Sequence, residues 1–292
     1  MSTGVIFAFL TIILFGSWAV PTKTLKIDPR IQAFWLTDGH FLLSGFIFLF
    51  FIRPLSFAEL IGPFIAGVLW ALGITSGYIG IRHLGITRAL GIWIPIVLIV
   101  SALWGLLFFG EAKILSLEKL VQTVFGIVLL VIAAFAIIFS SHGEEKLGNV
   151  GLGILASVIL GLIHGSFFVP LKTSSLPIYV TFLPLTIGMM ITTSFIVLVT
   201  NKFKLVYKPL TTFRMILAGL ILGGGNYTAL LTIQYLGVSQ GYPLTQLGII
   251  VNTLWGLLVF KEITTTRGKL LVAAGVFIAI VGAIILNSAR AK

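Results

Sequence analysis

One acidic side chain lies far from the loops that turns and charges mark along the sequence. Asp38 follows Arg30 by eight residues within an apolar stretch, whereas the other seven acids lie in loops or at the ends of such stretches. A carboxylate at this depth in a membrane is costly and usually faces a bundle interior or a water-filled cavity. Asp38 is therefore a candidate to bind a proton or a substrate hydroxyl. The alternative is a helix that begins later, with Asp38 as a cap near the interface.

The neighbours of Asp38 on a helix predict which way it faces. Trp35, Asp38, Leu42, Gly45 and Leu49 are three or four residues apart and share one stripe. Gly45 predicts the close approach of another helix, because glycine has no side chain to hold backbones apart. We expect this stripe to face other helices.

Two histidines within apolar stretches are candidates to carry protons, because histidine titrates near neutral pH. His40 is two residues from Asp38 and points to a different face, so we interpret it as a hydrogen-bond partner of a neighbouring helix. His164 stays a candidate coupling residue. Ser166 is two residues from His164 and diverges from it on a helix, which argues against a serine hydrolase.

Three glycines precede an amide in the eighth apolar stretch, at 223–227. Consecutive glycines weaken a helix and let other backbones approach. Asn226 offers donors and acceptors in the middle of this stretch. Binding sites in membrane proteins often form where a helix is interrupted near the midplane. We expect an interrupted helix and a binding site here, with helix packing alone as the alternative.

The ninth stretch adds amides and aromatic rings, in Gly241-Tyr242-Pro243-Leu244-Thr245-Gln246 and at Asn252. Amides suit the hydroxyls of a sugar, and an aromatic face suits the apolar face of a sugar ring. Trp18 lies near the end of a stretch, where tryptophan also serves as an interface anchor. The candidate substrate contacts are Trp18, Trp70, Asn226, Tyr227, Tyr242, Gln246 and Asn252.

Short turn and charge clusters separate the stretches that carry these residues. Of the 292 residues, 58% are hydrophobic and 9% are charged, which leaves too few charges to cover a soluble domain. About 20 mostly apolar residues cross a bilayer as a helix, and open strands would leave backbone groups unpaired there. We therefore expect an all-α integral membrane protein of ten transmembrane helices, over 3–22, 31–52, 58–80, 87–109, 119–140, 149–171, 177–200, 211–235, 239–260 and 267–287.

Three motifs recur in the second half of the chain in the same order. Residues 16–23 return as 165–172, residues 81–87 as 233–239, and residues 103–107 as 254–258, at offsets of 149, 152 and 151. The common register predicts an internal duplication, with a first repeat over 1–143 and a second over 144–292. Each repeat holds five spans, an odd number, so the second enters the membrane from the opposite side. The prediction is two inverted five-helix repeats, which can open a central site first to one side and then to the other.

Composition excludes several function classes. The chain has no cysteine, which excludes disulfides, thiolate metal sites and cysteine nucleophiles. No GxxxxGK[ST], HExxH or DxDxDG pattern is present, so we expect no ATP hydrolysis, no metal, no cofactor and no enzyme activity. The net charge of +11 comes from Lys and Arg between apolar runs, where they meet the lipid bilayer, so it indicates no nucleic-acid partner.

The charged residues also bear on orientation and pairing. Six of the 19 Lys and Arg lie on the side of the predicted topology that carries the termini, and the other thirteen lie opposite. The positive-inside rule therefore predicts both termini outside the cytoplasm of the cell membrane. Glu111 and Glu262 close equivalent helices next to basic residues, and we interpret both as structural ion pairs.

At these motifs the chain resembles the drug/metabolite transporter superfamily, in its sugar-porter branch of glucose/ribose porters and rhamnose-transporter-like proteins. The resemblance is carried by Val-Pro-x-Lys at 20–23 and 169–172, by the stretch 70–85, and by 235–262 with Pro243 and Gln246. With the ten-span layout it covers nearly the whole chain.

The resemblance implies a ten-helix inverted repeat that takes up a monosaccharide, coupled to a proton or a sodium ion. It supports Trp70, Asn226, Pro243 and Gln246 as pathway positions, whereas Ile74 stands at the position paired with Asn226, so symmetric substrate contacts are not expected. An exporter of amino acids or other small metabolites is the alternative use of this architecture. A lipid-handling or sensing membrane protein is a third reading, and the lack of a large soluble domain argues against a sensor.

Overall fold

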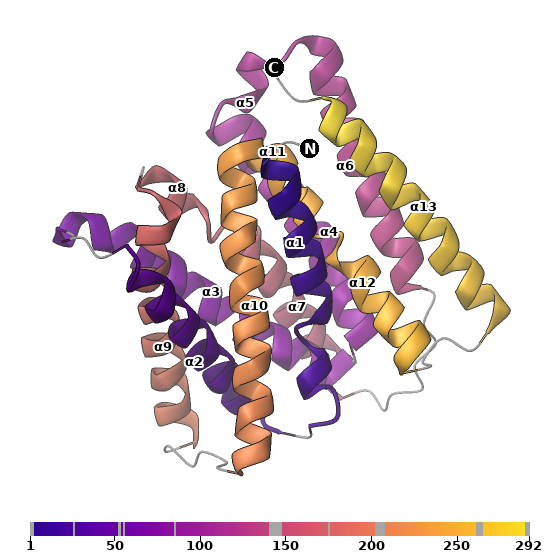
Figure 1. Cartoon of the computed structure of the whole chain (residues 1–292). Coiled ribbons are helices and arrows are strands. Elements are labelled where there is room, and N and C mark those ends of the chain that lie inside the picture. The colour runs from indigo at the N-terminus through magenta and orange to yellow at the C-terminus, as the bar shows by residue number, and fades with distance from the viewer. Residues whose placement is uncertain are drawn as a thin grey trace.

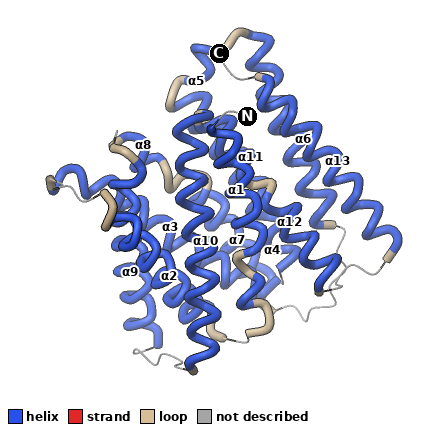
Figure 2. The backbone as a smooth tube through the Cα atoms, in the orientation of Figure 1, coloured by secondary structure: helices blue, strands red, loops and turns tan. Residues whose placement is uncertain are grey.

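Helices make up the architecture of the chain. The computed structural model describes residues 3–25, 27–51, 54, 56–84, 86–139, 148–174, 176–201, 208–260 and 265–289, and no strand occurs among them. Long helices stand side by side in Figures 1 and 2, and α1 begins at the end of the bundle where α13 finishes. The expected all-α class is confirmed.

The first half begins its helices at recognisable caps. Asp28 accepts a hydrogen bond from the Arg30 N–H at 2.9 Å and precedes Pro29, while Ser116 caps another helix. The elements are α1 (Thr3–Ser17), η1 (Val20–Thr22), α2 (Pro29–Phe48), α3 (Phe57–Leu84), α4 (Ile86–Leu103), the π-helix η2 (Trp104–Phe108), α5 (Glu111–Ile114) and α6 (Leu117–Ile138).

The second half repeats this order of long and short elements. Asn149 and Thr265 cap the first and last of its helices through their side-chain oxygens. The elements are α7 (Val150–His164), α8 (Val169–Thr173), α9 (Ile178–Asn201), α10 (Pro209–Leu236), α11 (Val238–Thr245), α12 (Gly248–Leu254), the π-helix η3 (Trp255–Val259) and α13 (Thr266–Ser288).

Eight helical segments of the described residues are long and apolar enough to cross a membrane, and Ile92–Phe108 is a shorter apolar helix. Large apolar side chains such as Phe46, Phe195 and Phe277 are more than 60% exposed on the outside of the bundle. Such a surface requires lipid rather than water around it. The chain is therefore a multi-pass integral membrane protein.

Helices of one half pack mainly against helices of the other. α3 contacts α7 and α9, as α10 contacts α1 and α2. α4 packs on α7, as α12 packs on α1, and α6 and α13 run side by side at one edge in Figure 1. Each of these contacts has a counterpart when the two halves are exchanged.

Four glycines allow the closest of these helix crossings. Gly39 of α2 faces Gly219 of α10, and Gly67 of α3 faces Gly188 of α9. A Cβ atom on any of the four would overlap a backbone carbonyl oxygen of the facing helix. Close backbone approach through glycine is the usual way in which membrane helices pack tightly.

The expected interruption of the eighth stretch is wrong, because α10 runs unbroken through 223–225. The glycines there make room for α1 and α2 instead: a Cβ on Gly225 would lie 2.5 Å from the Phe15 ring of α1, and a Cβ on Gly223 would lie 3.3 Å from the His40 Cα of α2. The interruption lies in the ninth stretch, where α11 ends at Thr245 and α12 begins at Gly248. Pro243 explains it, because proline lacks the N–H that continues a helix and its ring crowds the preceding turn.

The expectation that the stripe of Asp38 faces other helices is also wrong. Leu42 and Leu49 of α2 are 51% and 67% exposed, and nothing lies within 4 Å of a Cβ built on Gly45. The stripe faces the outside of the bundle. His40, two residues from Asp38, points inward and is completely buried.

Candidate functional site

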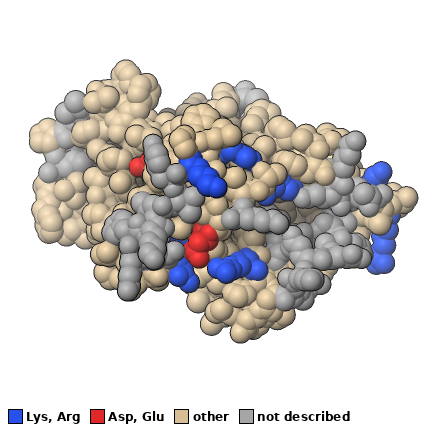
Figure 3. Space-filling model, turned by 90° about the horizontal axis from the view of Figure 1, so that it is seen from below, with Lys and Arg blue, Asp and Glu red and all other residues tan. Residues whose placement is uncertain are grey.

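A cavity of about 660 Å³ lies between the two halves of the bundle. It reaches the end where α1 finishes and α2 begins, and Lys23, Asp28 and Arg82 contribute to its lining there. Figure 3 shows this face from below, with basic side chains gathered around its middle and acidic atoms between them. We call this the open end of the cavity.

Trp70 of α3 lies at the inner part of the cavity between two histidines. Its ring centroid lies 4.8 Å from that of His40 and 5.4 Å from that of His164, whose plane is within 21° of parallel. The His164 Nε2 lies 3.1 Å from the Trp70 carbonyl oxygen. Trp70 is 2% exposed, so this packing holds a large aromatic ring rigidly at the cavity wall.

Asn226 of α10 brings an amide to the same region. It lines the cavity and its Nδ2 lies 2.9 Å from the His40 Nε2, while His40 Nδ1 lies 2.9 Å from the Leu36 carbonyl oxygen. The expectation that His40 bonds a neighbouring helix is confirmed. The pair joins α2 to α10 beside Trp70.

The break in the ninth segment places two more predicted residues at the cavity. The Tyr242 hydroxyl donates to the His164 carbonyl oxygen at 2.8 Å and its ring packs on Phe168. Gln246 lies in the break between α11 and α12, where its Nε2 bonds the Thr245 hydroxyl at 3.2 Å. Both residues line the cavity, Tyr242 from the last turns of α11 and Gln246 from the break itself.

Nearer the open end, aromatic rings and an amide continue the lining. Trp18 packs edge-on against Tyr78 with ring centroids 6.1 Å apart. Asn252 lines the cavity and its Nδ2 lies 3.5 Å from the Gly16 carbonyl oxygen. The ammonium of Lys23 lies 4.0 Å above the Phe260 ring. Polar and aromatic groups thus alternate along this wall.

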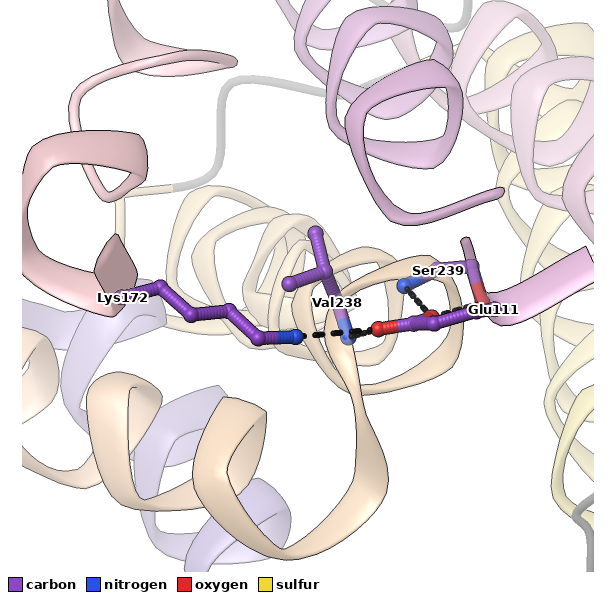
Figure 4. Close-up of polar contacts among 4 residues, drawn as sticks. All are labelled: Glu111, Lys172, Val238 and Ser239. Atoms are coloured by element: carbon purple, nitrogen blue, oxygen red, sulfur yellow. Dashed lines mark hydrogen bonds and ion pairs between the residues drawn. The ribbon is translucent and has the colours of Figure 1, made fainter. Parts of the chain in front are cut away.

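The opposite end is held together by Glu111, Lys172, Val238 and Ser239, drawn in Figure 4, and we call it the closed end. Glu111 Oε1 accepts from the Val238 N–H at 2.7 Å and from the Lys172 ammonium at 3.1 Å. Its Oε2 accepts from the Ser239 N–H at 2.9 Å and from the Ser239 hydroxyl at 2.6 Å. None of these four residues lines the cavity.

The charge of Glu111 is stabilised by this arrangement. Burial by itself would raise the pKa of Glu111, but hydrogen bonds from Ser239 and Val238 and the charge of Lys172 outweigh it and hold the pKa below the usual 4.5. Gly237, with a φ of 81°, turns the chain so that the next two N–H groups meet the carboxylate. The predicted structural pairing of Glu111 is confirmed, and Glu262 lies outside the described residues.

The structure brings most of the predicted site residues together, but not all. Tyr227 packs against Phe182 with ring centroids 5.2 Å apart and is not part of the cavity lining. Asp38 is partly exposed and also lies outside that lining. Those that line the cavity are Trp18, Trp70, His164, Asn226, Tyr242, Gln246 and Asn252.

Sequence reasoning missed other lining residues. Gln32 and Thr22 contribute polar atoms, but no motif or depth in the sequence marks them. Tyr78 lies in the glycine-spaced stretch that pairs with the region of Asn226, and this register could have indicated it. Within the ranges that the structure describes, no group of three or more His, Asp or Glu residues has the geometry of a metal site.

Comparison with known proteins gives a consistent result over the whole chain. The profile of a family described as "Sugar transport protein" matches residues 6–289. A candidate sugar uptake protein of Enterococcus faecalis is 28% identical, over 97% of this chain and 98% of its own. The glucose uptake protein GlcU of Bacillus subtilis is 26% identical, over 97% of each chain. A solved crystal structure has the same fold, with a TM-score of 0.72 at 14% identity over 98% of this chain and 96% of that one.

Proposed function

The chain belongs to the family of sugar transport proteins, and from this premise we propose that it is a secondary transporter that moves a monosaccharide across the cytoplasmic membrane by alternating access. The cavity carries the proposal. Its volume falls within the roughly 300–1,000 Å³ of sites for small molecules. The amides of Asn226 and Gln246 suit sugar hydroxyls, and the Trp18 ring, which is partly exposed in the lining, suits the apolar face of a sugar.

Counterflow of D-glucose into proteoliposomes tests this function, because exchange needs no driving ion. We expect uptake by the wild type and its loss in Asn226→Leu, which keeps the size of the side chain but removes its polar atoms. Thr228→Val is the matched control, since Thr228 lies on the same helix and bonds Thr11 rather than lining the cavity. Equal uptake by Asn226→Leu and the control would contradict the proposed site.

A ligand-stabilisation screen separates this function from its alternative. Purified protein is heated with sugars, amino acids and cationic drugs, and a rise in melting temperature with a monosaccharide is expected, because a ligand that binds the folded state stabilises it. Stabilisation by amino acids and by no sugar would instead favour an exporter of amino acids.

We propose further that the chain consists of ten transmembrane helices in two inverted repeats, 1–143 and 144–292. The boundary itself lies outside the described residues. Support comes from matched contacts, since the Trp255 Nε1 donates to the Ser17 hydroxyl at 3.0 Å as the Trp104 Nε1 donates to Ser166 at 2.8 Å. The facing glycines Gly39 with Gly219 and Gly188 with Gly67 also exchange under the same register.

The distribution of basic residues supports an orientation in which the open end faces the cytoplasm and both termini lie outside it. The chain has no native cysteine, so an introduced cysteine is the only thiol in the protein that the reagent can label. With an impermeant thiol reagent on intact cells, we expect Lys113→Cys to be labelled and Lys269→Cys to be labelled only after permeabilisation. Both positions are exposed. The reverse pattern would overturn the orientation.

Coupling to a proton or a sodium ion is proposed with Asp38 and His164 as candidate coupling residues. His164 lines the cavity, whereas Asp38 lies outside its lining. Asp38→Asn is expected to abolish uptake driven by a pH gradient while counterflow continues. If gradient-driven uptake survives in that variant, Asp38 is not the coupling residue, and His164→Gln is the next variant to measure.

A further inference from the structure

The hydrogen bonds around His40 determine which of its nitrogens carries the proton. His40 is 0% exposed, and its Nδ1 lies 2.9 Å from the Leu36 carbonyl oxygen. A carbonyl oxygen only accepts, so Nδ1 must donate, and in a neutral imidazole the other nitrogen then accepts. A doubly protonated ring would bury a positive charge, and no carboxylate among the described residues contacts it. His40 Nε2 is therefore an acceptor.

This tautomer in turn orients the amide of Asn226. The atom that lies 2.9 Å from His40 Nε2 must donate, so it is the amide nitrogen Nδ2 rather than the oxygen. Asn226 is 4% exposed and lines the cavity. Within the described part of the chain no donor is bonded to its Oδ1. The oxygen, together with the second N–H of Nδ2, is thus left to meet a ligand.

His164, on the other side of Trp70, provides an internal comparison. Its Nε2, not its Nδ1, lies 3.1 Å from a carbonyl oxygen, that of Trp70. The same argument therefore assigns the opposite tautomer, with the proton on Nε2. The buried His40 and the partly buried His164, which flank one indole ring, are expected to differ in this way.

We propose that His40 is a positioning residue that holds the Asn226 amide with Oδ1 toward the cavity, so that the site presents a hydrogen-bond acceptor to one hydroxyl of its sugar. This rests on the proposed function for the identity of the ligand. His40 itself lies outside the cavity lining, so its hydrogen bond can reach the ligand only by way of Asn226. A hydroxyl that donates to Oδ1 is recognised, whereas a substituent that cannot donate loses this bond and binds less tightly.

The first experiment needs no sugar and therefore tests the inference independently of the proposed function. Nitrogen-15 is introduced into the histidines of the full chain, which has four, and the ring nitrogen shifts are recorded in nanodiscs. His40→Gln and His164→Gln identify the two signals by their loss. We expect His40 to be protonated on Nδ1 only and His164 on Nε2 only. The same tautomer in both, or a charged His40, would overturn the inference.

The second experiment measures recognition, with D-glucose and its series of deoxyfluoro analogues as probes in counterflow. In the wild type, replacing the recognised hydroxyl by fluorine, which cannot donate, is expected to raise the half-saturation concentration about tenfold. In His40→Leu the amide is free to turn its nitrogen toward the cavity, so this discrimination falls to about twofold or less. His40→Gln, whose oxygen can accept from Asn226, should restore most of it.

The outcomes distinguish the two proposals. If the wild type neither binds nor exchanges D-glucose, the sugar assignment is in question, while the nitrogen shifts still decide the tautomer. If glucose is transported and His40→Leu keeps full discrimination against the fluoro analogue, His40 does not position the amide. Equal loss of transport in His40→Leu and His40→Gln would point to a purely structural role and would also contradict it.

Discussion

The two ends of the bundle carry nearly the same sequence, but the cavity lining includes Lys23 at one end and not Lys172 at the other. Each has a Val-Pro-x-Lys turn and a Trp-Gly-Leu-Leu π-helix, with a tryptophan bonded to a serine of the other half. At the closed end Lys172 pairs with Glu111, which also holds the first turn of α11. At the open end Lys23 lies over the Phe260 ring, as Lys172 lies over the Phe109 ring, but Lys23 lines the cavity and Lys172 does not. Under the alternating access proposed above, this structure is one of two states that the two halves exchange.

The closed end owes its stability mainly to hydrogen bonds with a charged partner. Glu111 accepts two backbone N–H groups at the start of α11 and one hydroxyl, and its side chain is 15% exposed. Hydrogen bonds to charged groups contribute about 1.5–3 kcal/mol each, and a helix N-terminus favours a negative charge. This predicts a ranking among substitutions that loosen the closed end.

Glu111→Gln is expected to have the largest effect, because it removes the charge and leaves Lys172 without its partner. A loss of about 3 kcal/mol would increase the fraction of molecules in which the closed end has opened by roughly a hundredfold. Spin labels on Ile114→Cys in α5 and Thr173→Cys in α8, both exposed, should report a second, longer distance. Glu118→Gln is the control, since Glu118 accepts from Gln122 of its own helix and, among the described residues, takes no part in the contacts of Glu111.

Ser239→Ala should have the next largest effect. It deletes the shortest of the four bonds to Glu111, at 2.6 Å, and leaves both backbone bonds in place. Loss of this hydrogen bond to a charged group should cost about 1.5 kcal/mol, which raises the fraction of molecules with this end open roughly tenfold. The same spin-label pair measures it, and Ser116→Ala, which removes a cap of α6 at this end, should leave the distance unchanged. An equal shift in both variants would contradict the assignment to Glu111.

Lys172→Gln should have a smaller effect, and it tests the comparison of the two ends directly. Lys172 is 34% exposed, and partly exposed ion pairs contribute about 1 kcal/mol or less, or about fivefold at most. Lys23→Gln, its counterpart at the open end, should leave the label distance at the closed end unchanged. A larger shift from Lys23→Gln than from Lys172→Gln would show that the two ends do not act separately.

The smallest expected effect is that of pH near neutrality. The lowered pKa of Glu111 means that its contribution to the closed end is complete above the usual value of 4.5 and is lost only as the pH falls through the lowered pKa. The label distance should therefore stay constant from about pH 8 to about pH 5 and lengthen only at lower pH. Opening near pH 7 would assign the proton-sensitive step to another group.

Features that depend on neighbours along the chain were predictable. The membrane helices follow from runs of apolar residues, and their predicted bounds differ from the observed ones by only a few residues at most ends. Asn226 and Gln246 were identified because amides are rare within such runs. Both side chains line the same cavity, at the centre that the repeated motifs pointed to.

The direction in which a side chain points was harder to predict. Asp38 was expected inside because a buried carboxylate is costly, but α2 turns that stripe outward and buries His40 instead. The break was expected at the glycines of α10 and occurs after Pro243, while the glycines leave room for His40 of α2 and for Leu14 and Phe15 of α1. In both cases the deciding neighbour lies on another helix.

The sequence by itself determined that this chain is a helical membrane protein with a repeated set of motifs, because hydropathy and motif spacing are local properties. Only the tertiary structure decided that His40 meets Asn226, 186 positions away, and that Glu111 binds the start of α11, 127 positions away. A hydrogen bond requires atoms within about 3 Å in a suitable direction. Helix rotation and crossing set that geometry, and residue type and spacing along one segment do not specify it.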